Sequence, residues 1–168
     1  VDRSRFFEIT AFSSDDLKRN EMYKENAVRA AQQAQFTDYG EYLHSLEMVA
    51  VIDDFLPVYL PRITQLTNKS NQFNLTTKRF TTAEMEQVFA DDSYIRLYGR
   101  LADKFGDNGI VSVVIGKVNG DALDIELWLM SCRVLKRDME YAMLDNLCDR
   151  AKQRGLKTVN GYYYPTAK

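Results

Sequence analysis

Three consecutive strand-like segments in the second half of the chain restrict the fold more than any other feature of the sequence. They cover 94–105, 110–118 and 123–134, and the middle segment is almost continuously apolar. Asn-Gly pairs at 108–109 and 119–120 separate them. Asn-Gly is a strong hairpin signal, because both central residues of a type I′ turn need a positive φ. We therefore expect an antiparallel meander.

A helix and a further strand are predicted after the meander. Asp138 can cap a helix that runs to Arg154, and Gly155 then stands just past its end, where a left-handed residue is favoured. Residues 156–164 are expected to form the next strand. A strand, a helix and a strand in this order form a right-handed crossover, which makes the two strands parallel.

The first half of the chain is predicted to be mainly helical. Thr81 and Glu84 form a capping box that opens a short helix. The other expected elements are helices over 14–35, 39–46 and 60–71 and a strand over 48–52. We interpret 1–46 as a helical connector from a domain outside this sequence. Residues 47–168 are then an α/β domain, a mixed sheet flanked by helices, which ends short at its C-terminus.

The composition excludes several classes of partner. The 22 basic and 24 acidic residues give a net charge of −2 without long blocks of either sign, which argues against nucleic acid or an anionic membrane surface. No apolar run approaches the roughly 18 residues of a membrane span. Cys132 and Cys148 do not have metal-ligand spacing. We expect a cytoplasmic, reduced chain without a metal site, and we assign no role to the single histidine, His44.

Four strings resemble one family of proteins. They are NKSNQFNLTT at 68–77, FGDNG at 105–109, SCRVL at 131–135 and YYPTAK at 163–168. The element order resembles the GNAT acyltransferase fold, and the four strings resemble the C-terminal half of FkbH-like proteins. This resemblance implies that the turn between the fourth strand and the third helix of the fold, here 131–140, binds the phosphates of a pantetheine carrier.

The resemblance also implies a pathway. FkbH-like proteins have an N-terminal HAD-type domain with an Asp-x-Asp motif, and they load a glyceryl unit onto an acyl carrier protein for methoxymalonyl-type extender units of polyketide biosynthesis. This sequence contains no Asp-x-Asp. It therefore resembles the part that handles the acyl group or the carrier protein. The implied partner is an acyl carrier protein, and the implied cofactor is coenzyme A or the carrier protein's phosphopantetheine.

The turn at 133–138 aligns with the GNAT pattern Arg-x-x-Gly-x-Gly. Arg133 is retained, but Lys136 and Asp138 occupy both glycine positions. One interpretation gives Arg133, Lys136 and Arg137 direct contacts with phosphates, which compensate for the crowded backbone. In the other interpretation, Arg133 is a solvated strand end and Asp138 is a plain helix cap.

Two residues are candidates for acid–base chemistry. The resemblance places a general base at Glu126 and a general acid at Tyr164. Strict alternation along the strand would put Asp124 and Glu126 on the same face as Trp128. The alternatives are an exposed carboxylate pair and a core tyrosine. Cys132 is either a nucleophile activated near a helix N-terminus or, as the commoner case, a buried structural cysteine.

The polar tract at 71–77 and the two cations that follow it form the last candidate site. Asn and Gln side chains either hold such a loop through its own backbone or bind the amides of a pantetheine arm. The residues predicted to contact the carrier protein or its arm are Asn71, Gln72, Asn74, Lys78 and Arg79. Two functions stay open: an acyltransferase that binds a thioester between splayed strands, and a non-catalytic docking module for the HAD-type domain.

Overall fold

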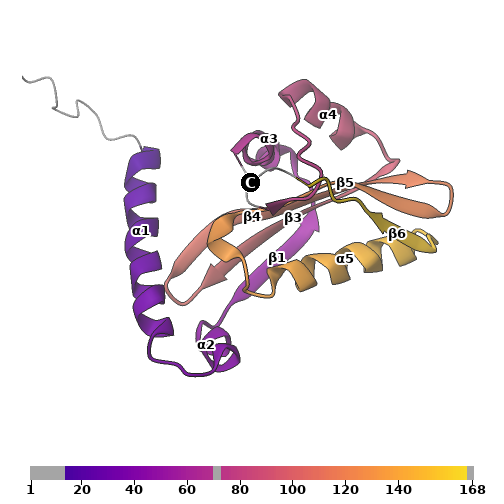
Figure 1. Cartoon of the computed structure of the whole chain (residues 1–168). Helices are drawn as coiled ribbons and strands as arrows, with labels where there is room; N and C mark the ends of the chain where they lie inside the picture. The colour runs from indigo at the N-terminus through magenta and orange to yellow at the C-terminus, as the bar shows by residue number, and fades with distance from the viewer. Residues whose placement is uncertain (1–13, 70–72, 166–168) are drawn as a thin grey trace, which may run out of the picture. The chain divides into compact units, whose positions relative to one another are not determined.

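The computed structural model describes residues 14–69 and 73–165 (Figure 1). Their contacts group them into two units. One unit holds the described residues up to Glu47 together with Asp103–Gly106, and the other holds Met48–Ala102 and the described residues from Asp107 onward. No helix in these ranges is long and apolar enough to cross a bilayer.

The first unit consists of two helices together with Asp103–Gly106. The helices are α1 (Ser14–Gln33) and α2 (Tyr39–Ser45), and Asp38 caps α2 by accepting the N–H of Glu41 at 2.8 Å. Arg29 on α1 donates two hydrogen bonds of 2.7 Å to the carboxylate of Asp103, and both side chains are buried. Burial alone would lower the pKa of Arg29, but the hydrogen bonds and charge of Asp103 outweigh it and raise the pKa. This ion pair fixes α1 on residue 103.

The second unit contains the sheet, in the order β1-β3-β4-β5, with β2 and β6 both on the outer edge of β5. Neighbouring pairs are antiparallel, except that β6 runs parallel to β5. The bounds are β1 Val49–Asp54, β2 Phe73–Asn74, β3 Tyr94–Asp103, β4 Gly106–Asn119, β5 Ala122–Met130 and β6 Thr158–Gly161. The predicted mixed sheet and the parallel crossover are confirmed.

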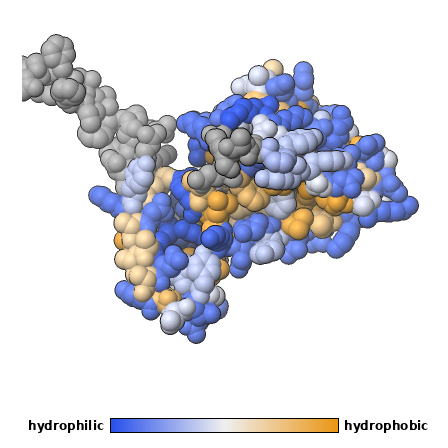
Figure 2. Space-filling view, viewed as in Figure 1, coloured by the Kyte–Doolittle hydropathy of each residue, from blue (hydrophilic) through white to orange (hydrophobic). Residues whose placement is uncertain are grey.

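Helices cover both faces of this sheet (Figure 1). One apolar cluster joins α5 (Met139–Gln153) to the sheet, and the other joins α3 (Leu60–Lys69) and α4 (Thr82–Ala90) to it. Gly99 on β3 allows the close approach of α5, since a Cβ there would lie 2.3 Å from Met139 Cε. Figure 2 shows hydrophobic side chains gathered in a band between more hydrophilic layers.

The predicted hairpin signals had different outcomes. The Asn-Gly pair at 119–120 forms the turn between β4 and β5, with Gly120 at a φ of 62°. The pair at 108–109 lies inside β4 instead, and the turn falls at 104–105. Asp107 holds this part of β4 through the N–H of Gly109, at 2.7 Å, and through Arg100. The third strand of the meander also ends early, at Met130, and Cys132–Val134 form a 3₁₀ turn.

Candidate functional site

The turn at 131–138 connects the end of β5 to the start of α5. Ser131 donates its N–H to the carbonyl of Val111 at 2.7 Å, and this bond fixes the beginning of the turn on β4. Val134 is fully buried among the residues under α5, so the middle of the turn is anchored as well. The residues that follow, 135–138, carry the turn to the first residue of the helix, Met139.

Two non-glycine residues in this turn have left-handed backbones. Lys136 has a φ of 64° and Asp138 a φ of 60°. The left-handed region costs a residue with a Cβ roughly 1–2 kcal/mol, although Asp tolerates it better than most. These are the two positions that align with glycine in the Arg-x-x-Gly-x-Gly pattern. The chain therefore keeps a glycine-type backbone at both positions while placing side chains there.

The prediction that Asp138 caps α5 with its carboxylate was wrong. Asp138 occupies the N-cap position, but its side chain makes no capping hydrogen bond in the described structure. A capping side chain reaches the helix N–H groups from an extended backbone, whereas Asp138 is left-handed with a ψ of 7°. Only its carbonyl takes part, by accepting the N–H of Ala142 at 3.2 Å.

Three cationic side chains accompany this helix N-terminus. Arg133 is half-buried and donates from Nε to the hydroxyl of Ser131 at 3.1 Å. Lys136 is exposed and Arg137 is partly exposed. The unsatisfied N–H groups of a helix start carry a partial positive charge, to which these cations add. Asp138 and Glu140 bring carboxylates to the same helix start, so the turn has a small excess of positive charge at the beginning of a 15-residue helix.

A β-bulge shapes the strand before the turn. Ile115 pairs with Leu127, but the next residue, Gly116, pairs with Ile125, so Glu126 has no partner on β4. The bulge reverses the alternation of faces, and Trp128 packs in the same cluster as Leu123. The expectation that Asp124 shares a face with Trp128 was therefore wrong, because strict alternation does not allow for an extra residue.

Glu126 forms an ion pair with Lys78. The Lys78 Nζ lies 2.5 Å from Oε2 of Glu126, and the two side chains are 43% and 25% exposed. The main-chain carbonyl of Glu126 also accepts the hydroxyl of Thr76 at 2.7 Å. The structure thus joins the predicted general base to a residue predicted to contact a partner, and sequence spacing did not indicate this pairing.

The described part of the polar tract lies along the outer edge of β5. Asn74 faces Leu129 in an antiparallel pair, and Leu75 donates its N–H to the carbonyl of Trp128 at 3.0 Å. Tyr164 donates its own N–H to the carbonyl of Leu75 at 2.9 Å, while its side chain is 56% exposed. Tyr164 is therefore not a core residue.

Other predicted contact residues have intramolecular roles or lie elsewhere. Arg79 donates from Nη1 to the carbonyls of Thr67 and Asn68, which are among the last of α3. Such bonds satisfy carbonyls that a helix end leaves unpaired. Asn71 and Gln72 lie outside the described residues. No finding tests their predicted contact with a carrier protein, nor that of Arg79.

The remaining predictions concern the cysteines and the side chains that could bind a metal ion. Cys132 is exposed, so the expectation of a buried structural cysteine was wrong; it begins the 3₁₀ turn after β5. Among residues 14–69 and 73–165, no group of three or more His, Cys, Asp or Glu side chains is arranged to hold a metal ion. His44 is exposed.

A second carboxylate, Asp124, to which the sequence assigned no role of its own, joins β5 to β6. Asp124 accepts hydrogen bonds from Asn160 Nδ2 at 2.8 Å, from Tyr162 Oη at 3.1 Å and from Asn119 Nδ2 at 3.2 Å. These bonds, led by the one from Asn160, lower the pKa of Asp124. The hydrogen bond to Asp124 raises the pKa of Tyr162. The cluster anchors β6, and a search for strand carboxylates opposite Asn or Tyr would have found it.

Comparisons with known proteins identify the fold. No protein-family model matches the chain, and no curated protein matches it. Solved structures do match, among them the ribosomal-protein-S18-alanine N-acetyltransferase of Escherichia coli, with 14% identity over 66% of this chain and a TM-score of 0.51. The matched region spans 64% of that enzyme's length.

Two further matches are of the same kind. AAC(6')-Iy, solved with a coenzyme A bisubstrate analogue, matches 71% of this chain and 82% of its own, with 9% identity and a TM-score of 0.56. A GNAT-family acetyltransferase from Streptococcus pneumoniae matches 64% of this chain and 70% of its own, with 17% identity and a TM-score of 0.51. The chain therefore has the GNAT fold, as its element order predicted. The FkbH-like resemblance stays a prediction.

Proposed function

We propose that this chain binds the phosphopantetheine thioester of coenzyme A or of an acyl carrier protein at the turn 131–138 and transfers its acyl group. One observation carries the proposal: the left-handed backbones of Lys136 and Asp138 immediately before α5. A strained conformation at two positions of one turn persists where the surroundings or the function require it. Here it gives the chain a glycine-type turn at the start of a helix.

The charges at this turn fit a phosphate ligand. The first N–H groups of α5 make no hydrogen bond to the Asp138 side chain, and Arg133, Lys136 and Arg137 add positive charge around them. Backbone N–H groups and the helix dipole together favour an anion, and Arg adds planar, two-pronged phosphate contacts. AAC(6')-Iy, which shares the fold, was solved with a coenzyme A derivative, and this supports the same ligand class here.

The acyl-transfer step assigns roles to two residues. Glu126 removes a proton from the acceptor nucleophile, which attacks the thioester carbonyl and forms a tetrahedral intermediate. The intermediate collapses by breaking the carbon–sulfur bond, and the leaving thiolate takes a proton from the hydroxyl of Tyr164. The ion pair between Glu126 and Lys78 must open before Glu126 accepts a proton.

The proposed context is that of an FkbH-like protein, as the four strings at 68–77, 105–109, 131–135 and 163–168 suggest. In that context the thioester is carried by an acyl carrier protein, and the acyl unit is a glyceryl group for a methoxymalonyl-type extender. Acyl carrier proteins are acidic, so Lys136 and Arg137 at the turn attract both the protein and the phosphate of its arm.

A second function has its own supporting observation. A non-catalytic docking module needs no free base, and Glu126 is held in an ion pair with Lys78 and in a chain of contacts with the tract. In this alternative the domain binds the carrier protein and presents its arm to the HAD-type domain. The two functions share the binding site at 131–138 and differ only in chemistry.

Binding and transfer are tested separately. Calorimetric titration with coenzyme A and with holo carrier protein should show saturable binding, and apo carrier protein should bind more weakly because it lacks the arm. Release of free thiol from an acyl-carrier thioester measures transfer. Glu126→Gln keeps a hydrogen-bond acceptor for Lys78 but removes the base, so it should bind normally and lose transfer. Binding without any thiol release by the parent supports the docking module, and absence of binding contradicts both functions.

A further inference from the structure

The outer edge of β5 is occupied by the chain's own segment 73–76. β6 pairs with β5 only from Ala122 to Ile125, and β2 covers Leu129 and Met130. Between them, the carbonyls of Glu126 and Trp128 point to this edge, and each accepts a hydrogen bond from the segment. The donors are the hydroxyl of Thr76 and the N–H of Leu75, at 2.7 and 3.0 Å.

At this edge β5 and β6, the two parallel strands that α5 connects, separate. β6 leaves β5 after Gly161, which pairs with Ile125, and the chain then runs to Tyr164 on the far side of the segment. The segment therefore lies between β5 and the residues that follow β6. An extended ligand that binds between these strands has to use the same carbonyls.

The groups that the segment supplies are an amide N–H and a hydroxyl in an extended chain. A phosphopantetheine arm is also an extended chain with amide N–H groups and a hydroxyl. The arm therefore has the donors needed to replace Leu75 and Thr76 at the carbonyls of Trp128 and Glu126. Strand addition of this kind provides affinity through main-chain hydrogen bonds.

The segment is held less completely than the rest of the sheet. Its strand is two residues long, and Oδ1 of Asn74 is buried without a hydrogen-bond partner in the described structure. On β5, Nε1 of Trp128 is also buried without a partner, next to the ring of Phe73 at 5.9 Å between centroids. Unsatisfied buried polar atoms are costly, so release of the segment relieves the cost at Asn74. A ligand that pairs with Nε1 of Trp128 also gains affinity relative to the segment.

We propose that the segment 73–76 is a built-in occupant of the thioester site, and that the pantetheine arm displaces it from the edge of β5. The inference rests on the proposed binding of a phosphopantetheine thioester. It also links binding to chemistry, because Lys78 lies two residues after this segment. Displacement of the segment draws Lys78 away from Glu126 and frees the carboxylate to act as a base.

The first test weakens the segment. Thr76→Val keeps the shape of the side chain but removes the hydrogen bond to Glu126, so the occupied state loses one neutral hydrogen bond. Affinity for 4′-phosphopantetheine, measured by calorimetry, should rise about fivefold. Thr158→Val makes the same chemical change at an exposed position of β6 and should leave the affinity unchanged. Equal or weaker binding by Thr76→Val overturns the inference.

The second test locks the segment in place. The bond from Leu75 to Trp128 makes the neighbouring pair, 74 and 129, a non-hydrogen-bonded pair, whose Cα atoms are roughly 4.5 Å apart and suit a disulfide. The double variant Asn74→Cys, Leu129→Cys is prepared with Cys132→Ser and Cys148→Ser. Its oxidised form should bind 4′-phosphopantetheine at least tenfold more weakly than its reduced form.

The outcomes separate the inference from the proposed function. Equal binding by the oxidised and reduced forms means that the segment does not occupy the site, while binding itself stands. If the parent chain, Thr76→Val and the reduced variant all fail to bind 4′-phosphopantetheine and coenzyme A, the proposed function is wrong. The inference, which rests on it, is then wrong as well.

Discussion

The N-termini of α4 and α5 are built in opposite ways. At α4, the hydroxyl of Thr81 accepts the N–H of Glu84, and the Glu84 carboxylate accepts the N–H of Thr81 at 2.7 Å. At α5, Asp138 has a left-handed backbone and its side chain caps nothing in the described structure. The first helix satisfies its orphan N–H groups internally, and the second leaves them without a side-chain cap.

We interpret this difference as one between a structural helix start and a proposed binding one. A capping box stabilises a helix, and the Glu84 carboxylate already provides the negative charge that the dipole favours. The start of α5 has no capping box, although Glu140 also places a carboxylate in its first turn. Three cations, Arg133, Lys136 and Arg137, lie in the turn that precedes it. The comparison therefore predicts that substitutions at α4 change stability, whereas substitutions at α5 change anion binding.

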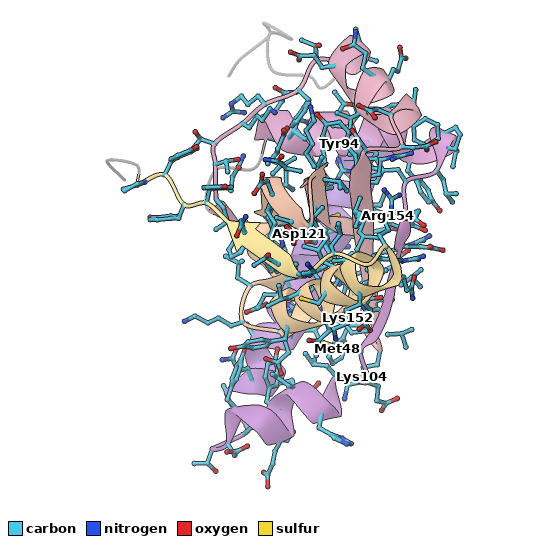
Figure 3. All side chains as sticks on the ribbon, turned by 90° about the vertical axis from the view of Figure 1, so that its right-hand side faces the viewer. Met48, Tyr94, Lys104, Asp121, Lys152 and Arg154 are labelled. Atoms are coloured by element: carbon cyan, nitrogen blue, oxygen red, sulfur yellow. The ribbon has the colours of Figure 1, made fainter. Side chains whose placement is uncertain are left out.

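The largest expected effect comes from reversing the charge at α5. Lys136→Glu with Arg137→Glu should weaken coenzyme A binding by about tenfold or more, because charge-assisted hydrogen bonds to phosphate are replaced by repulsion. The control, Lys152→Glu with Lys157→Glu, changes two exposed lysines; Lys152 lies at the other end of α5 (Figure 3). Equal affinities of the two double variants, measured by calorimetry, would show that the positive charges of the turn do not contribute to coenzyme A binding.

The next effect concerns Asp138 alone. Asp138→Asn keeps a side chain that tolerates the left-handed region but removes a negative charge from the phosphate site. Coenzyme A affinity should rise several-fold with little change in the melting temperature. Asp138→Ala should instead lose about 1 kcal/mol of stability, because alanine tolerates the left-handed backbone poorly. Unchanged affinity in the Asn variant would mean that residue 138 does not face the phosphates.

At α4 the expected effect is on stability only. Thr81→Ala removes the cap hydroxyl and should lower the free energy of unfolding by about 1 kcal/mol in a urea titration. Coenzyme A affinity should stay the same, because this helix start is not part of the proposed phosphate site. A change in affinity comparable to that of the Lys136 and Arg137 variant would abolish the contrast between the two helices.

The smallest effect is a dependence of stability on pH at α4. The hydrogen bonds from the N–H and hydroxyl of Thr81 lower the pKa of Glu84 below its ordinary value. The stabilisation is therefore present above the ordinary pKa of Glu, about 4.3, and is lost as the pH falls through the lowered value. Glu84→Gln should reduce the loss of stability between pH 5 and pH 3, measured by urea denaturation; an unchanged acid limb contradicts this role.

The sequence predicted those elements that local chemistry determines. The capping box at Thr81, the helix ending near Gly155 and the turn at Gly120 all follow from side-chain or glycine preferences, and all are present. The turn predicted at 108–109 is not present, and Asp107 binds that part of β4 through the N–H of Gly109 and through Arg100 on the adjoining strand. A turn preference alone therefore did not decide where this hairpin turns.

The candidate site was predicted less completely than the fold. The turn at 131–138 was found from its charges and its resemblance to a known pattern, but its left-handed backbones are visible only in the structure. The contact of Lys78 with Glu126 joins residues 48 positions apart, and the bulge at Glu126 depends on β4. Neither the contact nor the bulge produces a periodic pattern in the sequence.

The most direct test of the account is a nuclear magnetic resonance titration of the ¹⁵N-labelled chain with coenzyme A. We expect saturable shifts of the backbone amides from Lys136 to Tyr141, at the start of α5, and constant positions for the amides of Thr82 to Met85 at α4. Saturable binding that leaves the amides of α5 unmoved, or that shifts both helix starts alike, would contradict the assignment of the phosphate site to the uncapped helix.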